Sequence, residues 1–172
     1  VGEANTGRHG VGSGGTLTSG ISFGGSISTG QTAITEAWNG ATWTEVADLA
    51  TARSTLGGAG ANNTSALAFG GYAPPGVLNL TEEWSAPSTF TKQNLGQVYY
   101  NSTSDAFKVT KIVYGTGAWS SGGAMNTPRA QVAGAGSQGD GIVVGGSGPP
   151  PGSQNAELYD GSAWTETGNL SG

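Results

Sequence analysis

Three arginines and three glutamates recur at nearly constant spacing in this 172-residue chain and are its most evident candidates for chemistry. They are Arg8, Arg53, Arg129, Glu36, Glu82 and Glu157. Two carboxylates can act as the acid and base of glycoside hydrolysis. A position repeated in every unit is poor evidence for a unique active site, however. We therefore expect these carboxylates to pair with the arginines or to accept hydrogen bonds from backbone amides.

The composition leaves few groups for other chemistry. The chain has no cysteine, one methionine and one histidine, too few ligands for the usual zinc, copper, haem or iron–sulfur sites. His9 lies in a glycine-rich stretch without a recognisable serine or aspartate partner. We expect no cofactor, no metal site, no catalytic residue and no enzymatic activity.

The low number of basic residues argues against nucleic acid and anionic membranes as partners. The formal net charge is −5 with only 6 basic residues, whereas nucleic acids and anionic membranes attract clustered lysine and arginine. No stretch approaches the roughly 20 apolar residues that span a bilayer. We expect neither nucleic acid nor a membrane as a partner.

The arginines and glutamates belong to a repeat of about 45 residues. Strands of each repeat unit must position these side chains. The 33 glycines oppose long helices, whereas 14 aromatic residues favour a folded chain. Each arginine is followed after 16 or 17 residues by a Gly-Gly pair that closes an apolar run, and each glutamate follows that pair. The glycine pairs are Gly24–Gly25, Gly70–Gly71 and Gly145–Gly146.

An aromatic residue stands two positions after each glutamate, and a second one follows a few residues later. The pairs are Trp38 with Trp43, Trp84 with Phe90, and Tyr159 with Trp164. The alternating Glu-x-aromatic segments predict strands, and the Asn-Gly or Asp-Gly that follows in the first and third units is typical of two-residue hairpin turns. We therefore predict four short antiparallel strands per unit, with these tryptophans and Trp119 packed between units.

We interpret residues 1–172 as a single repeat domain with units at about 8–49, 50–95, 96–126 and 127–172. The third unit is abbreviated, because a separate hairpin at 97–110 replaces its Gly-Gly half. Its end rejoins the repeat, since Trp119 precedes Arg129 by the same 10 residues that separate Trp43 from Arg53.

This pattern resembles the kelch repeat, in which a basic residue, a strand closed by Gly-Gly and two spaced aromatics define one blade of a β-propeller. The resemblance implies an all-β fold of kelch-like blades, each a four-stranded antiparallel sheet. Four units could close a small ring, belong to a longer chain, or be completed by neighbouring chains, because closed propellers have four to eight blades.

The segment YYNSTSDAFKV, beside low-charge units of the form GAWSSGG…NTPR, is similar to virion and tail-associated proteins of marine bacteriophages (cyanophages). This resemblance implies a non-enzymatic structural or adhesive protein of the virion, in the tail, a fibre or associated with the capsid. Other virion proteins would be its partners, in a homo-oligomer or a longer chain, with a host-surface glycan as a further candidate. The alternatives are a secreted, lectin-like kelch propeller and, less favoured, a carbohydrate-active enzyme.

Two loops outside the repeat register are the candidate binding rim, because both follow a Gly-Gly pair and loops often carry function. Their residues are Tyr72, Pro74, Pro75, Pro149, Pro150 and Pro151.

Overall fold

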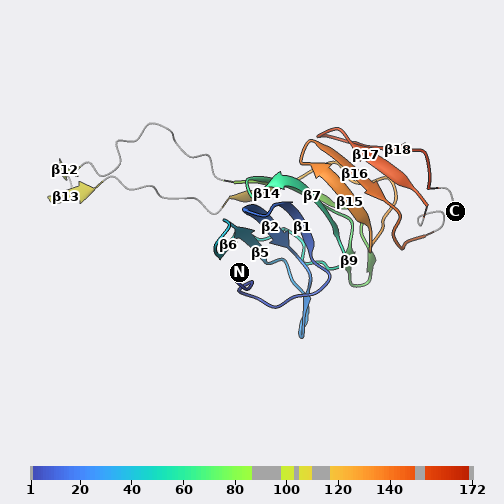
Figure 1. Cartoon of the computed structure of the whole chain (residues 1–172), viewed down its shortest axis with the longest axis horizontal. Coiled ribbons are helices and arrows are strands. Elements are labelled where there is room, and N and C mark those ends of the chain that lie inside the picture. The colour runs from blue at the N-terminus through green and yellow to red at the C-terminus, as the bar shows by residue number, and fades with distance from the viewer. Residues whose placement is uncertain (1, 87–97, 103–104, 110–116, 150–153, 171–172) are drawn as a thin grey trace.

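The computed structural model describes residues 2–86, 98–102, 105–109, 117–149 and 154–170, and its regular structure there consists of strands. Three four-stranded antiparallel sheets lie in a row, with the first near the N-terminus and the third near the C-terminus (Figure 1). The fold is therefore all-β, as the composition and repeat predicted. Within these residues no helix is present that could cross a membrane.

The first sheet shows how the repeat forms its strands. It has the order β1 (Gly12–Thr16), β2 (Ser19–Phe23), β5 (Thr35–Trp38) and β6 (Trp43–Val46). Strand β2 ends at Gly24 and Gly25, whose φ values of 64° and 101° are strained for residues with a side chain. The apolar run therefore stops at the predicted place.

The other two sheets have the same strand order. The second contains β7 (Gly57–Asn62), β8 (Ser65–Phe69), β11 (Thr81–Ser85) and β14 (Ala118–Ser121). The third contains β15 (Ala133–Ser137), β16 (Asp140–Val144), β17 (Ala156–Tyr159) and β18 (Trp164–Thr167). Three two-stranded hairpins accompany them: β3 (Ser26–Ile27) with β4 (Gly30–Gln31), β9 (Tyr72–Ala73) with β10 (Gly76–Val77), and β12 (Val98–Asn101) with β13 (Ala106–Val109).

Strand pairing corrects the predicted unit boundaries. Residues 96–126 do not form an abbreviated unit, because β14 pairs with β11 and completes the second sheet. Trp119 faces Trp84 in that register, as Trp43 faces Trp38 and Trp164 faces Tyr159. The hairpin β12–β13 is thus inserted between the third and fourth strands of the second sheet. Phe90, the expected second aromatic of that unit, lies outside the described residues.

Each sheet contains one buried ion pair between the repeated arginine and glutamate. Arg8 binds Glu36 at 2.6 Å, Arg53 binds Glu82 at 2.6 Å, and Arg129 binds Glu157 at 2.5 Å, with every side chain at most 5% exposed. The predicted pairing is confirmed. Burial lowers the pKa of Arg53, and the charge of Glu82 opposes that shift.

The glutamates also tie down the backbone that precedes each arginine. The amides of Asn5, Ala50 and Asn126 each donate to the glutamate of their own unit at 2.7–2.8 Å. In the third sheet, Arg129 donates further hydrogen bonds to the carbonyl oxygens of Gly145 and Asn155. Arginine, glutamate, the strand end and the incoming segment are therefore joined in one network.

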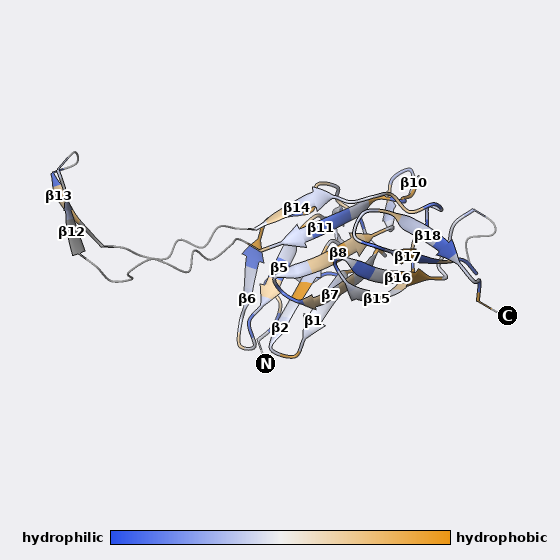
Figure 2. Cartoon of the chain, turned by 90° about the horizontal axis from the view of Figure 1, so that it is seen from above, coloured by the Kyte–Doolittle hydropathy of each residue, from blue (hydrophilic) through white to orange (hydrophobic). Residues whose placement is uncertain are grey.

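The middle sheet packs between the other two by a recurring interface (Figure 2). Phe23 lies against Gly58 of the second sheet, and Phe69 lies against Gly134 of the third. Each phenylalanine also meets a tryptophan ring edge-on, Phe23 with Trp119 at 5.0 Å and Phe69 with Trp164 at 5.2 Å. The expected packing of tryptophans between units is confirmed at these two interfaces.

We predict that Glu36→Gln lowers the free energy of unfolding by about 3–5 kcal/mol, because it leaves Arg8 buried without a counter-ion. Glu45→Gln is the matched control, since Glu45 is the exposed cross-strand neighbour of Glu36 and should change stability by less than about 0.5 kcal/mol. Urea denaturation monitored by tryptophan fluorescence measures both. Equal shifts in the two variants would contradict a structural role for the pair.

We also predict that Gly134→Ala destabilises the protein by about 1–3 kcal/mol, because the added Cβ would lie 2.2 Å from Cζ of the buried Phe69. Gly139→Ala, in the turn of the same hairpin, meets nothing within 4 Å and should be tolerated. Thermal unfolding of the two variants tests this, and a neutral Gly134→Ala would show that the sheets are not in the described contact.

Candidate functional site

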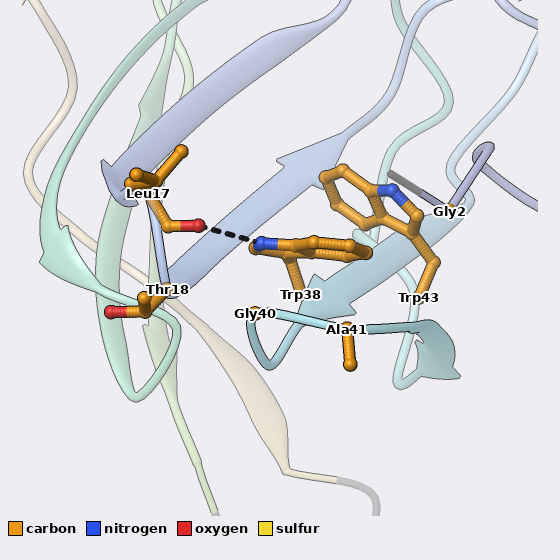
Figure 3. A pocket seen from close by; sticks show the side chains of 7 residues that line it. All are labelled: Gly2, Leu17, Thr18, Trp38, Gly40, Ala41 and Trp43. Atoms are coloured by element: carbon orange, nitrogen blue, oxygen red, sulfur yellow. Dashed lines mark hydrogen bonds between the residues drawn. The ribbon is translucent and has the colours of Figure 1, made fainter.

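A pocket of about 680 Å³ opens on the face of the first sheet that points away from the second. Its aromatic residues are Trp38 and Trp43, whose rings are tilted at 41° with centroids 5.4 Å apart (Figure 3). Its other lining residues are Gly2, Leu17, Thr18, Gly40 and Ala41. None of the seven is titratable, so the pocket offers apolar and aromatic surface rather than charge.

Two turns at the same end of the first sheet build this pocket. The turn between β1 and β2 supplies Leu17, whose carbonyl oxygen accepts a hydrogen bond of 2.8 Å from Nε1 of Trp38. The turn between β5 and β6 spans four residues rather than the predicted two, because the Asn39 side chain accepts from the amides of Ala41 and Thr42. These bonds fix Trp38 at one wall of the pocket.

The Leu17 side chain is the most exposed large apolar side chain described, at 90% exposure. A buried indole beside an exposed leucine and a half-buried second indole can contact a sugar ring or an apolar protein surface.

The positions that form this pocket are covered in the other two sheets. Trp84 and Trp119 pack against the first sheet, where Nε1 of Trp119 donates to Oγ1 of Thr35 at 3.2 Å. Tyr159 and Trp164 pack against the second sheet, where Nε1 of Trp164 donates to Oγ1 of Thr81 at 2.9 Å. The pocket is therefore the open counterpart of a surface that elsewhere receives a neighbouring sheet.

The predicted rim residues are not at this pocket. Tyr72 lies in β9, where its backbone pairs with Ser54, and its side chain is 37% exposed. Pro74, Pro75 and Pro149 are exposed, whereas Pro150 and Pro151 lie outside the described residues. The rim follows the Gly-Gly end of each β2-type strand, and the pocket lies at the opposite end. A binding role for the rim stays a prediction.

Sequence reasoning assigned Trp38 and Trp43 to core packing and did not identify the pocket. One signal was present: Leu17 occupies the repeat position that carries Asn63 in the second unit and Gln138 in the third. Those amides donate to the carbonyl oxygens of Trp38 and Trp84 in the preceding sheet. A leucine in this turn marks a unit whose outer face differs from the others.

The remaining candidates for chemistry form no second site among the residues that the structure describes. Each repeated glutamate uses both carboxylate oxygens inside the fold. His9 is exposed and pairs with Ser26 through its backbone. No cluster of three or more potential metal ligands is found in this part of the chain.

The chain matches no protein-family model, and no curated protein matches it.

Tyr159 occupies the position in the third sheet that Trp38 occupies in the first, and there it is covered by the second sheet. It is 1% exposed and donates to Oε1 of Glu83 at 2.5 Å. Burial, followed by the hydrogen bond and charge of Glu83, raises its pKa from 10 to about 12. The neutral phenol is therefore favoured in the folded state. Its stabilisation is complete below pH 10 and is lost as the pH rises toward 12.

We predict that one tyrosine fewer ionises near pH 12 in Tyr159→Phe, measured by tyrosinate absorbance. The stability of this variant should also fall less steeply than that of the wild type between pH 10 and pH 12. The identical slope in both proteins would contradict the placement of Tyr159 against Glu83.

Proposed function

We propose that this chain is a non-enzymatic structural protein of a bacteriophage virion, in the tail, a fibre or associated with the capsid, built of kelch-like propeller blades. The observation that carries the proposal is the recurring interface between sheets. The surface that receives a preceding sheet is uncovered on the first sheet, and the surface that packs on a following sheet is uncovered on the third. A protein of this construction acts by packing against other protein surfaces.

The arrangement of the sheets supports the propeller-blade interpretation. All three have the same antiparallel order, in which the first strand of each packs against the first strand of the next. Close packing of first strands is typical of blades around a common axis. The closure of such a ring, within one chain or between chains, is part of the proposal.

The polar residues support a structural rather than a catalytic role. The repeated glutamates, which have the residue type needed for glycoside hydrolysis, are committed to arginine and backbone partners. Tyr159, a titratable group at a covered counterpart of the pocket, is bound to Glu83. The virion assignment itself is supported by the sequence resemblance and by the low charge of the chain.

A second function is favoured by one observation, the aromatic pocket. Trp38 and Trp43 present indole surface without charge, a chemistry that suits stacking against a sugar ring. This feature supports the alternative of a carbohydrate-binding protein, either at the host surface or secreted.

Fractionation of particles tests the proposed function. We expect mass spectrometry to detect peptides of this chain in gradient-purified particles of the virus that encodes it. The peptides should remain after the particles are washed with high salt. Recovery only from the particle-free medium would overturn the virion assignment and favour the secreted alternative.

A glycan array with the purified chain separates packing from sugar binding. The structural proposal predicts a flat signal that Trp43→Ala leaves unchanged. A glycan-specific signal that is lost in Trp43→Ala and kept in Phe107→Ala, an exposed aromatic of the β12–β13 hairpin, would instead establish the carbohydrate-binding function.

A further inference from the structure

We infer that two copies of this chain associate head to tail, with the open face of the first sheet in one copy receiving the open face of the third sheet in another. This inference rests on the proposed function, in which the chain acts through packing of its sheets, and it names the partner. The two internal interfaces between sheets have the geometry that the interface between copies would repeat.

The open face of the third sheet carries apolar side chains at positions that are covered in the other sheets. Ile142, Val144 and Leu158 project from the face opposite Val143 and Tyr159, which pack against the second sheet. Leu158 is 45% exposed, and Leu170, at the repeat position of the buried Leu49 and Met125, is 48% exposed. This face therefore presents aliphatic surface where the first and second sheets contact a neighbour.

The open face of the first sheet presents the complementary half. Trp38 and Trp43 stand where Trp84 with Trp119 and Tyr159 with Trp164 receive the preceding sheet. Val11 stands at the repeat position of Leu56, which is 5% exposed, yet Val11 itself is 38% exposed. Both outer faces therefore carry exposed apolar side chains, Val11 and Leu17 on the first sheet and Leu158 on the third.

Each outer face lacks one of the side chains that make polar contacts at the internal interfaces. The amide donors Asn63 and Gln138 are replaced by Leu17. The hydroxyl acceptors Thr35 and Thr81 are replaced by Ala156. These are two separate bonds, because the amides bind backbone carbonyl oxygens and the hydroxyls bind indole N–H groups. The inferred interface therefore lacks both bonds and depends on apolar packing and on the backbone contact described next.

A backbone ladder through the row has the polarity that head-to-tail packing requires. The amide of Thr55 donates to the carbonyl of Gly10 at 2.7 Å, and the amide of Gln131 donates to the carbonyl of Thr55 at 2.7 Å. Gly10, Thr55 and Gln131 all have φ between 52° and 64°. In the inferred assembly, the amide of Gly10 in one copy lies opposite the carbonyl oxygen of Gln131 in the next. The interface thus continues the internal register.

An interface between two different faces is heterologous, so it builds a ring if the rotation closes and a filament if it does not. Leu17→Glu and Leu158→Glu each place a carboxylate on one of the faces, at a side chain exposed enough to leave the fold intact. Phe107→Glu adds the same charge to the 76% exposed aromatic of the β12–β13 hairpin and is the matched control.

Analytical ultracentrifugation over a range of concentrations tests the inference. We expect the wild type and Phe107→Glu to associate beyond the dimer, and each interface variant to weaken association by about tenfold or more. We expect an equimolar mixture of Leu17→Glu and Leu158→Glu to form a dimer and stop there. Each variant keeps one intact face, and the two intact faces fit each other.

A wild type that is monomeric at every concentration would overturn the inference, as would a mixture of the variants that stays monomeric while the wild type associates. Association abolished by one variant and untouched by the other would indicate that identical faces pair, which also overturns it. Particle fractionation is independent of these outcomes. A monomeric chain recovered in particles would refute the self-association and leave the proposed function standing.

Discussion

A buried arginine–glutamate pair in each sheet joins the segment that enters the unit to the third strand of the sheet. Because removing two charges from water is costly, further hydrogen bonds to the remaining groups help to stabilise such a pair, although among the described residues no partner is found for Nε and Nη2 of Arg53 or for Nε of Arg129. Here the second carboxylate oxygen accepts a backbone amide three residues before the arginine. In the first and third sheets the guanidinium also reaches the carbonyl oxygens at the strand ends. The spacing of the repeat is therefore fixed by this network.

The contact between sheets follows from the position of that network. With the Gly-Gly end of each strand fixed, the phenylalanine before it projects onto the first strand of the next sheet. Only glycine leaves room there, since a Cβ at Gly58 or Gly134 would lie within 3 Å of the ring. The same contact presents an indole N–H to a threonine hydroxyl, so each interface combines close apolar packing with polar bonds. The outer faces keep the aromatic and aliphatic parts of this arrangement, but Leu17 and Ala156 replace two of the polar side chains.

The β12–β13 hairpin is inserted between two strands of the second sheet without changing the order of its strands. The outer strand β14 pairs with β11 in the same register as the outer strands of the other two sheets, although more than 30 residues of chain intervene. Such an insertion is compatible with the sheet because the outer strand is selected by its aromatic pairing and by the Trp119 contact with the first sheet. The hairpin itself presents an edge-on aromatic pair, Tyr100 and Phe107, with 52% and 76% exposure.

The sequence by itself determined the all-β class, the strands that end at Gly-Gly, the Arg–Glu pairing and most of the aromatic positions, because these features depend on local spacing that recurs three times. It did not determine which strand completes the second sheet, since strand pairing across an insertion is a non-local choice. It also did not show which of the aromatic pairs are covered by another sheet. Trp38 and Trp84 occupy the same repeat position, and only the presence or absence of a preceding sheet decides whether the surface around them is an interior contact or a pocket.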